Sequence, residues 1–279
     1  MKPYILKLFF IIIFLLASLY FATKVTSLKN SKSKFSSEEL DEAVAVLNES
    51  GVIIKNDVVL NSKVVPGVLK LDFDTESVEK IASGIMHGDY GTFTVPNGQR
   101  FASDNETFSF FYDYTFEYKN LSYEFDFDLT DKFATEFIPD DAEKLEDFFV
   151  KIFKNDDVEI ETLSLSKDER FTYYKAFELY RGVRVEGAEI EAVFEGEKLV
   201  LARGKIFLSN KVAEYYSDAL DSVNILFEID KSELEIIDMS LMYYQVSDND
   251  NSLYFTPNYK FIYEDGSSAV YDATSGIKK

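Results

Sequence analysis

The sequence predicts an α+β protein in which helices are followed by antiparallel sheets, preceded by one transmembrane helix at the N-terminus. Three observations predict this arrangement. Residues 5–22 are apolar except for one lysine. Aromatic residues make up 16% of the chain and lie mostly in alternating runs, a pattern typical of β-strands. Apolar residues recur at helical spacing ahead of those runs, which indicates three helix-then-sheet units.

Residues 5–22, ILKLFFIIIFLLASLYFA, have about the minimum length for a helix that crosses the hydrocarbon core. Lys7 lies near one end, from which its amine reaches the interface. Residues 1–4 would then be a short cytoplasmic tail, and this short tail favours a C-terminal part outside the cell, although the flanking charges show no clear bias. A cleaved signal peptide is the alternative, because Val25 and Ser27 are a small-residue pair, with an unfavourable lysine beside them.

Charge is divided unevenly along the chain, whose net charge is −21. The first 37 residues hold six lysines and no acid, which leaves 23 basic against 50 acidic residues from Glu38 onward, a net charge of −27. Residues 23–37 are therefore predicted to be a basic linker. An acidic surface repels nucleic acid and anionic lipid head groups. The absence of cysteine excludes a lipoprotein anchor, disulfides and thiolate metal sites.

An N-terminal extracytoplasmic α+β domain is predicted over residues 38–130. Ser37 is the expected N-cap of a helix over residues 38–49, and Gly51 is expected to end that helix. His87 falls in the segment HGDYG, which is expected to be a loop. Two β-rich runs and a second helix are expected at residues 52–60, 64–73 and 75–86.

The clearest strand signal lies in residues 108–118 and 121–129, FSFFYDYTFEY and LSYEFDFDL. Only two residues separate these alternating runs, so they are expected to pair as a hairpin. In the second run Glu124, Asp126 and Asp128 share one face, because side chains alternate along a strand. This acidic face either simply faces water or docks a basic patch of a partner, which would relieve the repulsion between three like charges.

A C-terminal extracytoplasmic domain of helix-sheet units is predicted over residues 131–279. Asp140 is the expected cap of a helix that reaches about Lys154, and residues 158–209 are expected to form four strands. A further helix and three strands are expected at residues 212–227, 234–246, 253–264 and 268–272.

Reactive groups form no recognisable catalytic pattern. His87 is the only histidine, and no Gly-x-Ser-x-Gly setting occurs, so His87 is interpreted as a surface loop residue. Residues 248–251 resemble the start of a calcium loop, but Leu253 stands where glycine is required, which favours a solvated turn. Nothing selects one pair among the 50 carboxylates for hydrolysis. No catalytic residue, metal site or cofactor is therefore predicted.

Small residues lie near the end of the predicted transmembrane helix. Ser18 and Ala22 are four residues apart, with Ala17 beside them, a pattern that allows two helices to approach closely. These three residues are the candidate interface with a partner helix. The alternative is an ordinary lipid-facing anchor in which they have no role.

Residues 177–208, FELYRGVRVEGAEIEAVFEGEKLVLARGKIFL, resemble the strand–turn–strand signature of PepSY-like and metalloprotease propeptide modules. The last 24 residues are similar to the closing strand, Asp-Gly turn and final strand of a PepSY-like unit. This resemblance implies PepSY-like or cystatin-like helix-sheet units. The residues that carry it are Tyr180, Gly182, Val183, Val185, Gly187, Pro257, Tyr259, Asp265, Gly266, Tyr271 and Gly276.

Together with the single anchor, the length of 279 residues and the segment LNESGVIIKNDVV, these modules make the whole chain resemble the YycI family of low-GC Gram-positive bacteria. The resemblance implies a membrane-anchored extracytoplasmic protein that acts with a YycH-like protein on the WalK (YycG) sensor histidine kinase of cell-wall homeostasis. Contact is expected partly through transmembrane helices, without enzymatic activity. An inhibitor or chaperone of a secreted protease is the main alternative, because propeptide-like modules occupy an enzyme's cleft. An acidic envelope hydrolase is a third reading.

Overall fold

The computed structural model describes residues 35–55, 58, 65–124, 146, 148, 149, 152, 157–207, 211–215, 219–229, 232–249 and 252–279. The chain is mostly β, with a few short helices and a large mixed sheet. It divides into two compact units. Unit 1 comprises the residues up to Pro66, Asp218–Ser240 and Tyr259–Lys279, and unit 2 comprises Gly67–Ser217 and Leu241–Asn258.

Several predicted features lie outside the described residues. These are the tail at residues 1–4, the transmembrane helix at residues 5–22 with Ala17, Ser18 and Ala22, nearly all of the basic linker at residues 23–37, and the domain boundary near residue 130. In the part of the chain that is described, no helix has the length and apolar character needed to cross a membrane.

Unit 1 begins with α2 (Ser37–Ser50), and the strand β1 (Val52–Ile54) follows it. The predicted N-cap, Ser37, is wrong by one residue: Ser36 caps the helix, because its hydroxyl accepts from the N–H of Glu39 while the Glu39 carboxylate accepts from the N–H of Ser36. This reciprocal pair needs Ser and Glu three residues apart. Gly51 ends the helix with a φ of 93°, as predicted.

The remaining elements of unit 1 are α6 (Asn224–Phe227), β14 (Ser268–Asp272) and parts of β12 (Ser232–Asn249) and β13 (Ser252–Tyr263).

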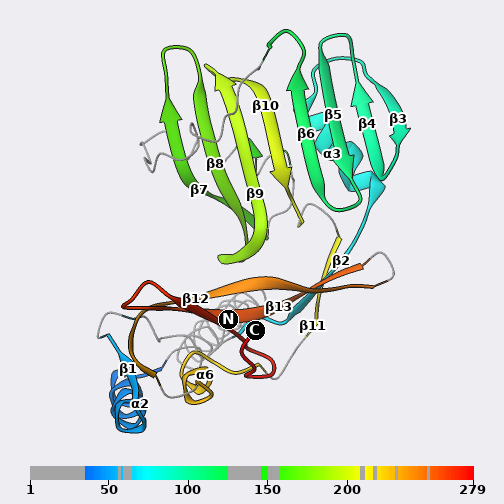
Figure 1. Cartoon of the computed structure of the whole chain (residues 1–279). Helices are drawn as coiled ribbons and strands as arrows, with labels where there is room; N and C mark the ends of the chain where they lie inside the picture. The colour runs from blue at the N-terminus through cyan, green and yellow to red at the C-terminus, as the bar shows by residue number, and fades with distance from the viewer. Residues whose placement is uncertain are drawn as a thin grey trace, which may run out of the picture. The chain divides into compact units, whose positions relative to one another are not determined.

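Unit 2 is built on a mixed sheet (Figure 1). Its strand order is β11-β2-β13-β12-β9-β10-β6-β5-β4-β3, and β8 and β7 continue from β9. The β12–β9 pair is parallel, whereas pairs such as β9–β10 and β2–β13 are antiparallel. Besides the helix α3 (Thr75–Ile85), the elements are β2 (Val68–Asp72), β3 (Gly91–Val95), β4 (Gly98–Ala102), β5 (Glu106–Phe111), β6 (Thr115–Asn120), β7 (Val158–Lys167), β8 (Thr172–Tyr180), β9 (Val183–Glu195), β10 (Lys198–Lys205) and β11 (Lys211–Tyr215).

Alternation along the strands separates a buried face of this sheet from a solvated one. The four strands expected within residues 158–209 are confirmed as β7 to β10, and those expected after residue 234 as β12 to β14. A row of side chains on the buried face is fully inaccessible: Phe101, Phe108, Tyr118, Ala202, Ala192 and Tyr174. The adjacent row, one residue along each strand, is polar: Arg100, Ser109, Glu117, Arg203, Glu191 and Lys175.

The buried face is covered by helical residues whose apolar side chains face it. Four residues of α3 are buried at helical spacing: Val78, Ile81, Ala82 and Ile85. Of the helix predicted to reach about Lys154, four residues are described, and all are helical. Among them Phe149 is fully buried and stacks on Tyr174 with ring centroids 5.7 Å apart. The core of unit 2 is therefore rich in aromatic contacts.

The predicted hairpin between residues 108–118 and 121–129 is wrong. The first run folds back on itself, and β5 pairs with β6 so that Phe108 lies opposite Tyr118. Asp113 explains the reversal, because its carboxylate accepts from the N–H and the hydroxyl of Thr115 and so favours a turn in mid-run. Of the second run, the residues beyond Glu124 lie outside the described part.

The helix predicted over residues 212–227 is also largely wrong. Lys211–Tyr215 is the strand β11, which pairs antiparallel with β2, and of the described residues in this range only Asn224–Phe227 are helical. Val212 packs against the core of unit 2, which sheet pairing with β2 makes possible. Asp221 begins the short helix by accepting from the N–H of Asn224. Here tertiary pairing overrides local helical spacing.

Candidate functional site

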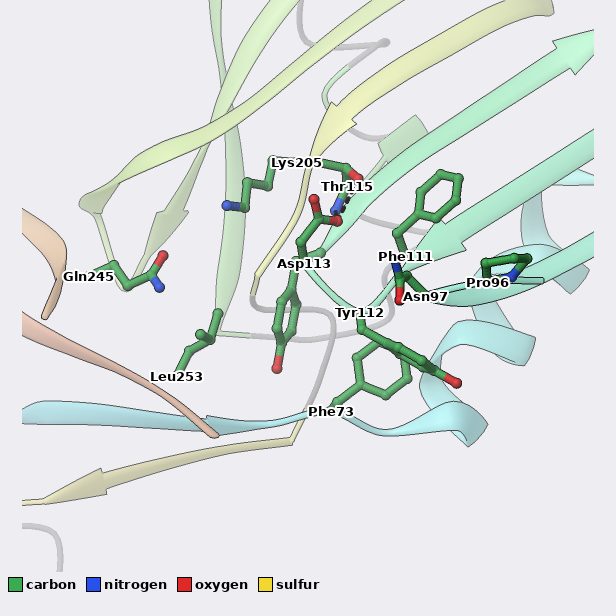
Figure 2. Close-up of a pocket in the computed structure, with 11 residues that line it drawn as sticks. Phe73, Pro96, Asn97, Phe111, Tyr112, Asp113, Thr115, Lys205, Gln245 and Leu253 are labelled. Carbon is green, nitrogen blue, oxygen red and sulfur yellow. Dashed lines mark hydrogen bonds between the residues drawn. The ribbon is translucent and has the colours of Figure 1, made fainter. Parts of the chain in front are cut away.

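A cavity of about 990 Å³ lies in unit 2, beside the turns that join β3 to β4 and β5 to β6 (Figure 2). Aromatic and polar side chains line it together. They include Phe73, Asn97, Tyr112, Asp113, Lys205 and Gln245. Such a mixed lining suits a ligand that presents an apolar group and a few polar contacts.

The β5–β6 turn holds an unusual backbone conformation at the cavity wall. Tyr114 has a φ of 66°, which is rare for a bulky residue. The turn is held in place because the Tyr114 N–H donates to the Phe111 carbonyl over 2.9 Å and the Tyr114 carbonyl accepts from Ile206 over 3.1 Å. Tyr112 N–H donates to the Asn97 carbonyl over 2.8 Å, which joins this turn to the β3–β4 turn. Strained residues of this kind often occur at binding sites.

The aromatic part of the wall consists of rings that contact one another edge to face. Phe73 lies 5.1 Å from Tyr112 and 5.8 Å from Tyr114, measured between ring centroids. Tyr112 is 52% exposed, so one edge of the cavity is an accessible aromatic surface. Such rings offer large contact area at low entropic cost, a property that favours protein recognition.

The polar part of the wall consists of Lys205, Gln245 and the Asp113–Thr115 turn (Figure 2). The Lys205 ammonium lies 4.9 Å from the centre of the Phe207 ring. The Asp113 carboxylate accepts from Thr115, so it supports the turn. The cavity thus offers an ammonium, a carboxylate and an amide beside aromatic rings, and these groups can bind a ligand.

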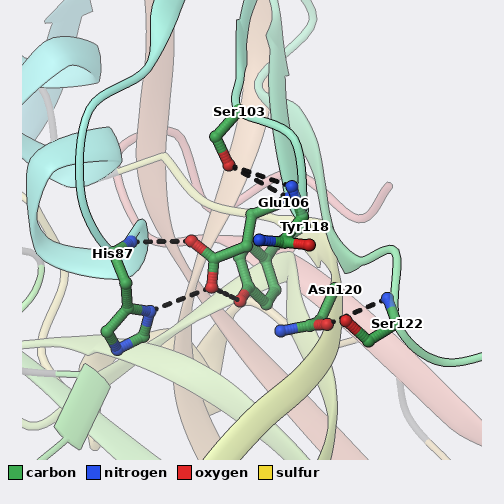
Figure 3. A network of polar contacts seen from close by, with 7 residues as sticks. His87, Ser103, Glu106, Tyr118, Asn120 and Ser122 are labelled. Carbon is green, nitrogen blue, oxygen red and sulfur yellow. Dashed lines mark hydrogen bonds and ion pairs between the residues drawn. The ribbon is translucent and has the colours of Figure 1, made fainter.

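A second polar cluster surrounds Glu106, at the start of β5 (Figure 3). The His87 N–H donates to one carboxylate oxygen over 2.7 Å, and the His87 ring Nδ1 lies 3.0 Å from the other, which also accepts from the Tyr118 hydroxyl over 2.9 Å. The Glu106 side chain is 6% exposed, whereas that of His87 is 73% exposed. His87 is therefore a loop residue, as predicted, and Glu106 anchors that loop.

Sequence reasoning missed Glu106, although the necessary signal was present. In a strand, residues two apart face the same way, and Glu106 precedes the core residues Phe108 and Phe110 at that spacing. A carboxylate on the core face requires hydrogen-bond donors, so partners were to be expected. His87 and Tyr118 supply them.

The environment of Glu106 lowers the pKa of its carboxyl group. Burial disfavours the charged form, but the donors on His87 and Tyr118 outweigh burial. The same burial and the nearby carboxylate raise the pKa of Tyr118. Because the folded-state pKa of Glu106 lies below its unfolded value, its ionised form stabilises the fold above the unfolded pKa, and this stability is lost as pH falls through the folded pKa.

We expect the substitution Glu106→Gln to lower the free energy of unfolding by about 1.5–3 kcal/mol at neutral pH, because a charged acceptor is lost. The difference from the wild type should shrink as the pH is lowered to about 3. Urea unfolding across this pH range measures both effects. Glu117→Gln, at a more exposed carboxylate on β6, is the matched control and should change little. A difference that is constant with pH would contradict the role of the ionised Glu106.

Of the other predicted site residues the structure describes Glu124, which does not line the cavity. Glu124 is exposed, and Asp126 and Asp128 lie outside the described residues. No group of three or more metal-ligating side chains gathers among the residues that the structure describes. Asp248 and Asn249 belong to β12 and not to a loop. The acidic strand face therefore stays a prediction.

No protein-family model matches the chain, and no curated protein matches it. Among solved structures, an uncharacterized protein from Eubacterium rectale is similar, with a TM-score of 0.46 and 14% identity, over 86% of this chain and 98% of that chain. The C-terminal domain of YpeB from Bacillus megaterium is similar with a TM-score of 0.37 and 11% identity, over 75% of this chain and 96% of that one. Because no family model matches, that of the YycI family included, the resemblance to that family stays a prediction.

Proposed function

We propose that this protein is a membrane-anchored extracytoplasmic regulator of a sensor histidine kinase, of the WalK (YycG) type, and that it acts by protein contact and not by catalysis. The anchor crosses the cell membrane with its N-terminus inside, and the acidic units lie outside. A YycH-like membrane protein is its expected second partner. The resemblance to the YycI family is the source of the kinase assignment.

The observation that carries the proposal is the division of the chain into an apolar segment at residues 5–22 and a strongly acidic remainder. An anchor holds an attached binding domain at the membrane, so the domain mainly encounters partners in the same membrane. The cavity in unit 2 supports a binding role, because its open aromatic edge at Tyr112 suits a protein ligand.

The Glu106–His87 pair does not favour an enzyme. The Glu106 carboxylate accepts hydrogen bonds from the His87 N–H and from the Tyr118 hydroxyl, so its oxygens are used to hold the His87 loop. A catalytic carboxylate–histidine pair needs a nucleophile or substrate site at the free ring nitrogen. The cavity is lined by other residues, and neither His87 nor Glu106 is among them.

Replacement of Ser18 and Ala22 by leucine in the full chain tests the proposed anchor contact. Bulky residues would keep the two helices apart, so recovery of the kinase in a membrane two-hybrid assay should fall strongly while the folding of the outer units is unchanged. Leu16→Phe is the control, because adjacent residues of a helix are about 100° apart and position 16 faces almost the opposite side from Ser18.

The identity of the partner is tested by purification of the wild-type chain in mild detergent. Recovery of a histidine kinase that depends on Ser18 and Ala22 supports the proposal. Recovery of a secreted hydrolase would instead favour the protease inhibitor or chaperone. Kinase recovery that the leucine pair does not alter would show that the anchor is passive.

A further inference from the structure

The edge strand β3 presents an unprotected row of main-chain groups. Among the described residues it pairs only with β4, and it lies at the end of the strand order in unit 2 (Figure 1). Its sequence, GTFTV, contains neither a charge nor a proline. The other end strands, β7 and β11, carry charged residues such as Glu159, Glu161 and Glu214. Charged residues and prolines are the usual protection of an edge strand against the addition of another strand, and β3 contains neither.

The register of β3 shows which groups point outward. Val95 and Gly98 are paired across the two-residue turn at Pro96 and Asn97. In an antiparallel pair, alternate residues direct their N–H and C=O groups to the partner strand, so those of Thr92 and Thr94 face the open edge. The Phe93 side chain is 53% exposed, which leaves an apolar surface beside that edge.

The open edge leads directly to the cavity. Pro96 and Asn97, which follow β3, both line it, and the Tyr112 N–H binds the Asn97 carbonyl (Figure 2). Two cations flank this path: Arg100 lies opposite Phe93, and Lys205 lines the cavity. Arg100 binds the Ser109 hydroxyl, and neither cation forms an ion pair with any residue that the structure describes. In a chain with 50 acidic residues, two cations without an ion pair among the described residues, Arg100 beside β3 and Lys205 at the cavity, favour an acidic ligand.

A second copy of the chain fits this surface poorly. Each copy has a net charge of −21, so association must overcome mutual repulsion. Pairing of two strands of 5 residues also buries much less than the roughly 1,200 Å² of a stable interface. An extended peptide needs less area, because its main chain gains hydrogen bonds along the edge and one side chain fills a pocket.

We infer that β3 and the adjoining cavity form a docking site for an extended segment of a partner protein. The segment adds to β3 as a further strand, inserts an aromatic or large aliphatic side chain into the cavity, and places a carboxylate near Arg100 or Lys205. This inference rests on the proposed function, because it assigns a binding surface for the protein partner. The surface lies in unit 2 and is separate from the predicted contact between transmembrane helices.

The test is selection of a displayed library of random short peptides on the detergent-solubilised full chain, followed by fluorescence anisotropy with the enriched peptides. The enriched peptides should alternate apolar and polar residues and carry at least one acidic residue.

Thr92→Pro removes a main-chain N–H that faces the open edge and should weaken peptide binding about tenfold. Thr92→Val keeps this N–H and should leave peptide binding unchanged. Lys205→Gln should weaken binding by about fivefold. Lys198→Gln, also a lysine on β10 over an aromatic ring, is its control.

Circular dichroism of each variant shows that it is folded. If no peptide is enriched, or if the peptides bind Thr92→Pro and Lys205→Gln as tightly as the wild type, the docking site is wrong. A wild-type dimer that Thr92→Pro dissociates would also overturn it, in favour of a second copy. Kinase recovery without edge-dependent peptide binding would refute the docking site alone. Edge-dependent peptide binding without kinase recovery would refute the kinase proposal alone.

Discussion

Replacement of Gly204 by alanine should prevent stable folding of unit 2. Gly204 lies on β10 between β9 and β6, and its φ is +148°. A Cβ at this position would lie 2.0 Å from the carbonyl oxygen of Glu189, a backbone atom that cannot move without disrupting β9. We expect a loss of about 4 kcal/mol or more in the free energy of unfolding, measured by urea unfolding, or a failure to recover soluble protein.

Gly196→Ala is the matched control for Gly204, because it lies in the turn of the same β9–β10 hairpin. Its φ is +61°, but a Cβ there would meet nothing within 4 Å. Only the left-handed backbone conformation is then penalised, at about 1–2 kcal/mol. Equal losses in the free energy of unfolding for the two variants would show that the β10 and β9 backbones do not approach each other closely at Gly204.

Replacement of Phe108 by alanine should cost about 3–5 kcal/mol, because it removes a large side chain from a core that cannot collapse fully. Phe108 is fully buried, and its ring lies 6.0 Å from that of Phe101 and 6.3 Å from those of Phe110 and Phe116. The loss should appear as a lower midpoint of unfolding in urea, with folded protein still recoverable at low temperature.

Phe93→Ala is the control for Phe108, since both residues belong to neighbouring parts of the same sheet. Phe93 is 53% exposed, so its removal should change the free energy of unfolding by about 0.5 kcal/mol or less. A loss comparable to that of Phe108→Ala would mean that Phe93 is packed against other groups. It would then be unsuitable as part of an open docking surface.

Strand content was predictable where alternation and turn residues agree. In residues 158–209, runs of alternating residues are separated by turn glycines, and Gly182 and Gly196 have the positive φ expected of turns. The run FSFFYDYTFEY alternates without a glycine, so its internal turn was not recognised. There Tyr114 adopts a left-handed conformation that glycine usually occupies in such turns. The Tyr114 N–H donates to the Phe111 carbonyl, and the Tyr114 carbonyl accepts from the Ile206 N–H, which together hold this conformation.

The cavity could not be predicted, because its residues come from segments far apart in the sequence. Phe73 follows β2, Tyr112 lies in the β5–β6 turn, and Gln245 belongs to β12. Each of these residues is unremarkable in its own segment. Only strand order and register bring them together, and those depend on pairing between distant strands.

Alternation and helical spacing are local properties of the chain. The sequence by itself therefore determined which side chains of β5 and of α3 face the core. It also determined the net charge and the apolar segment near the N-terminus. Tertiary structure alone decided that Lys211–Tyr215 is a strand, that Glu106 meets His87, and that β3 is left at an edge beside the cavity. The physical reason is that a strand is stabilised by hydrogen bonds to a neighbour that its own sequence does not specify.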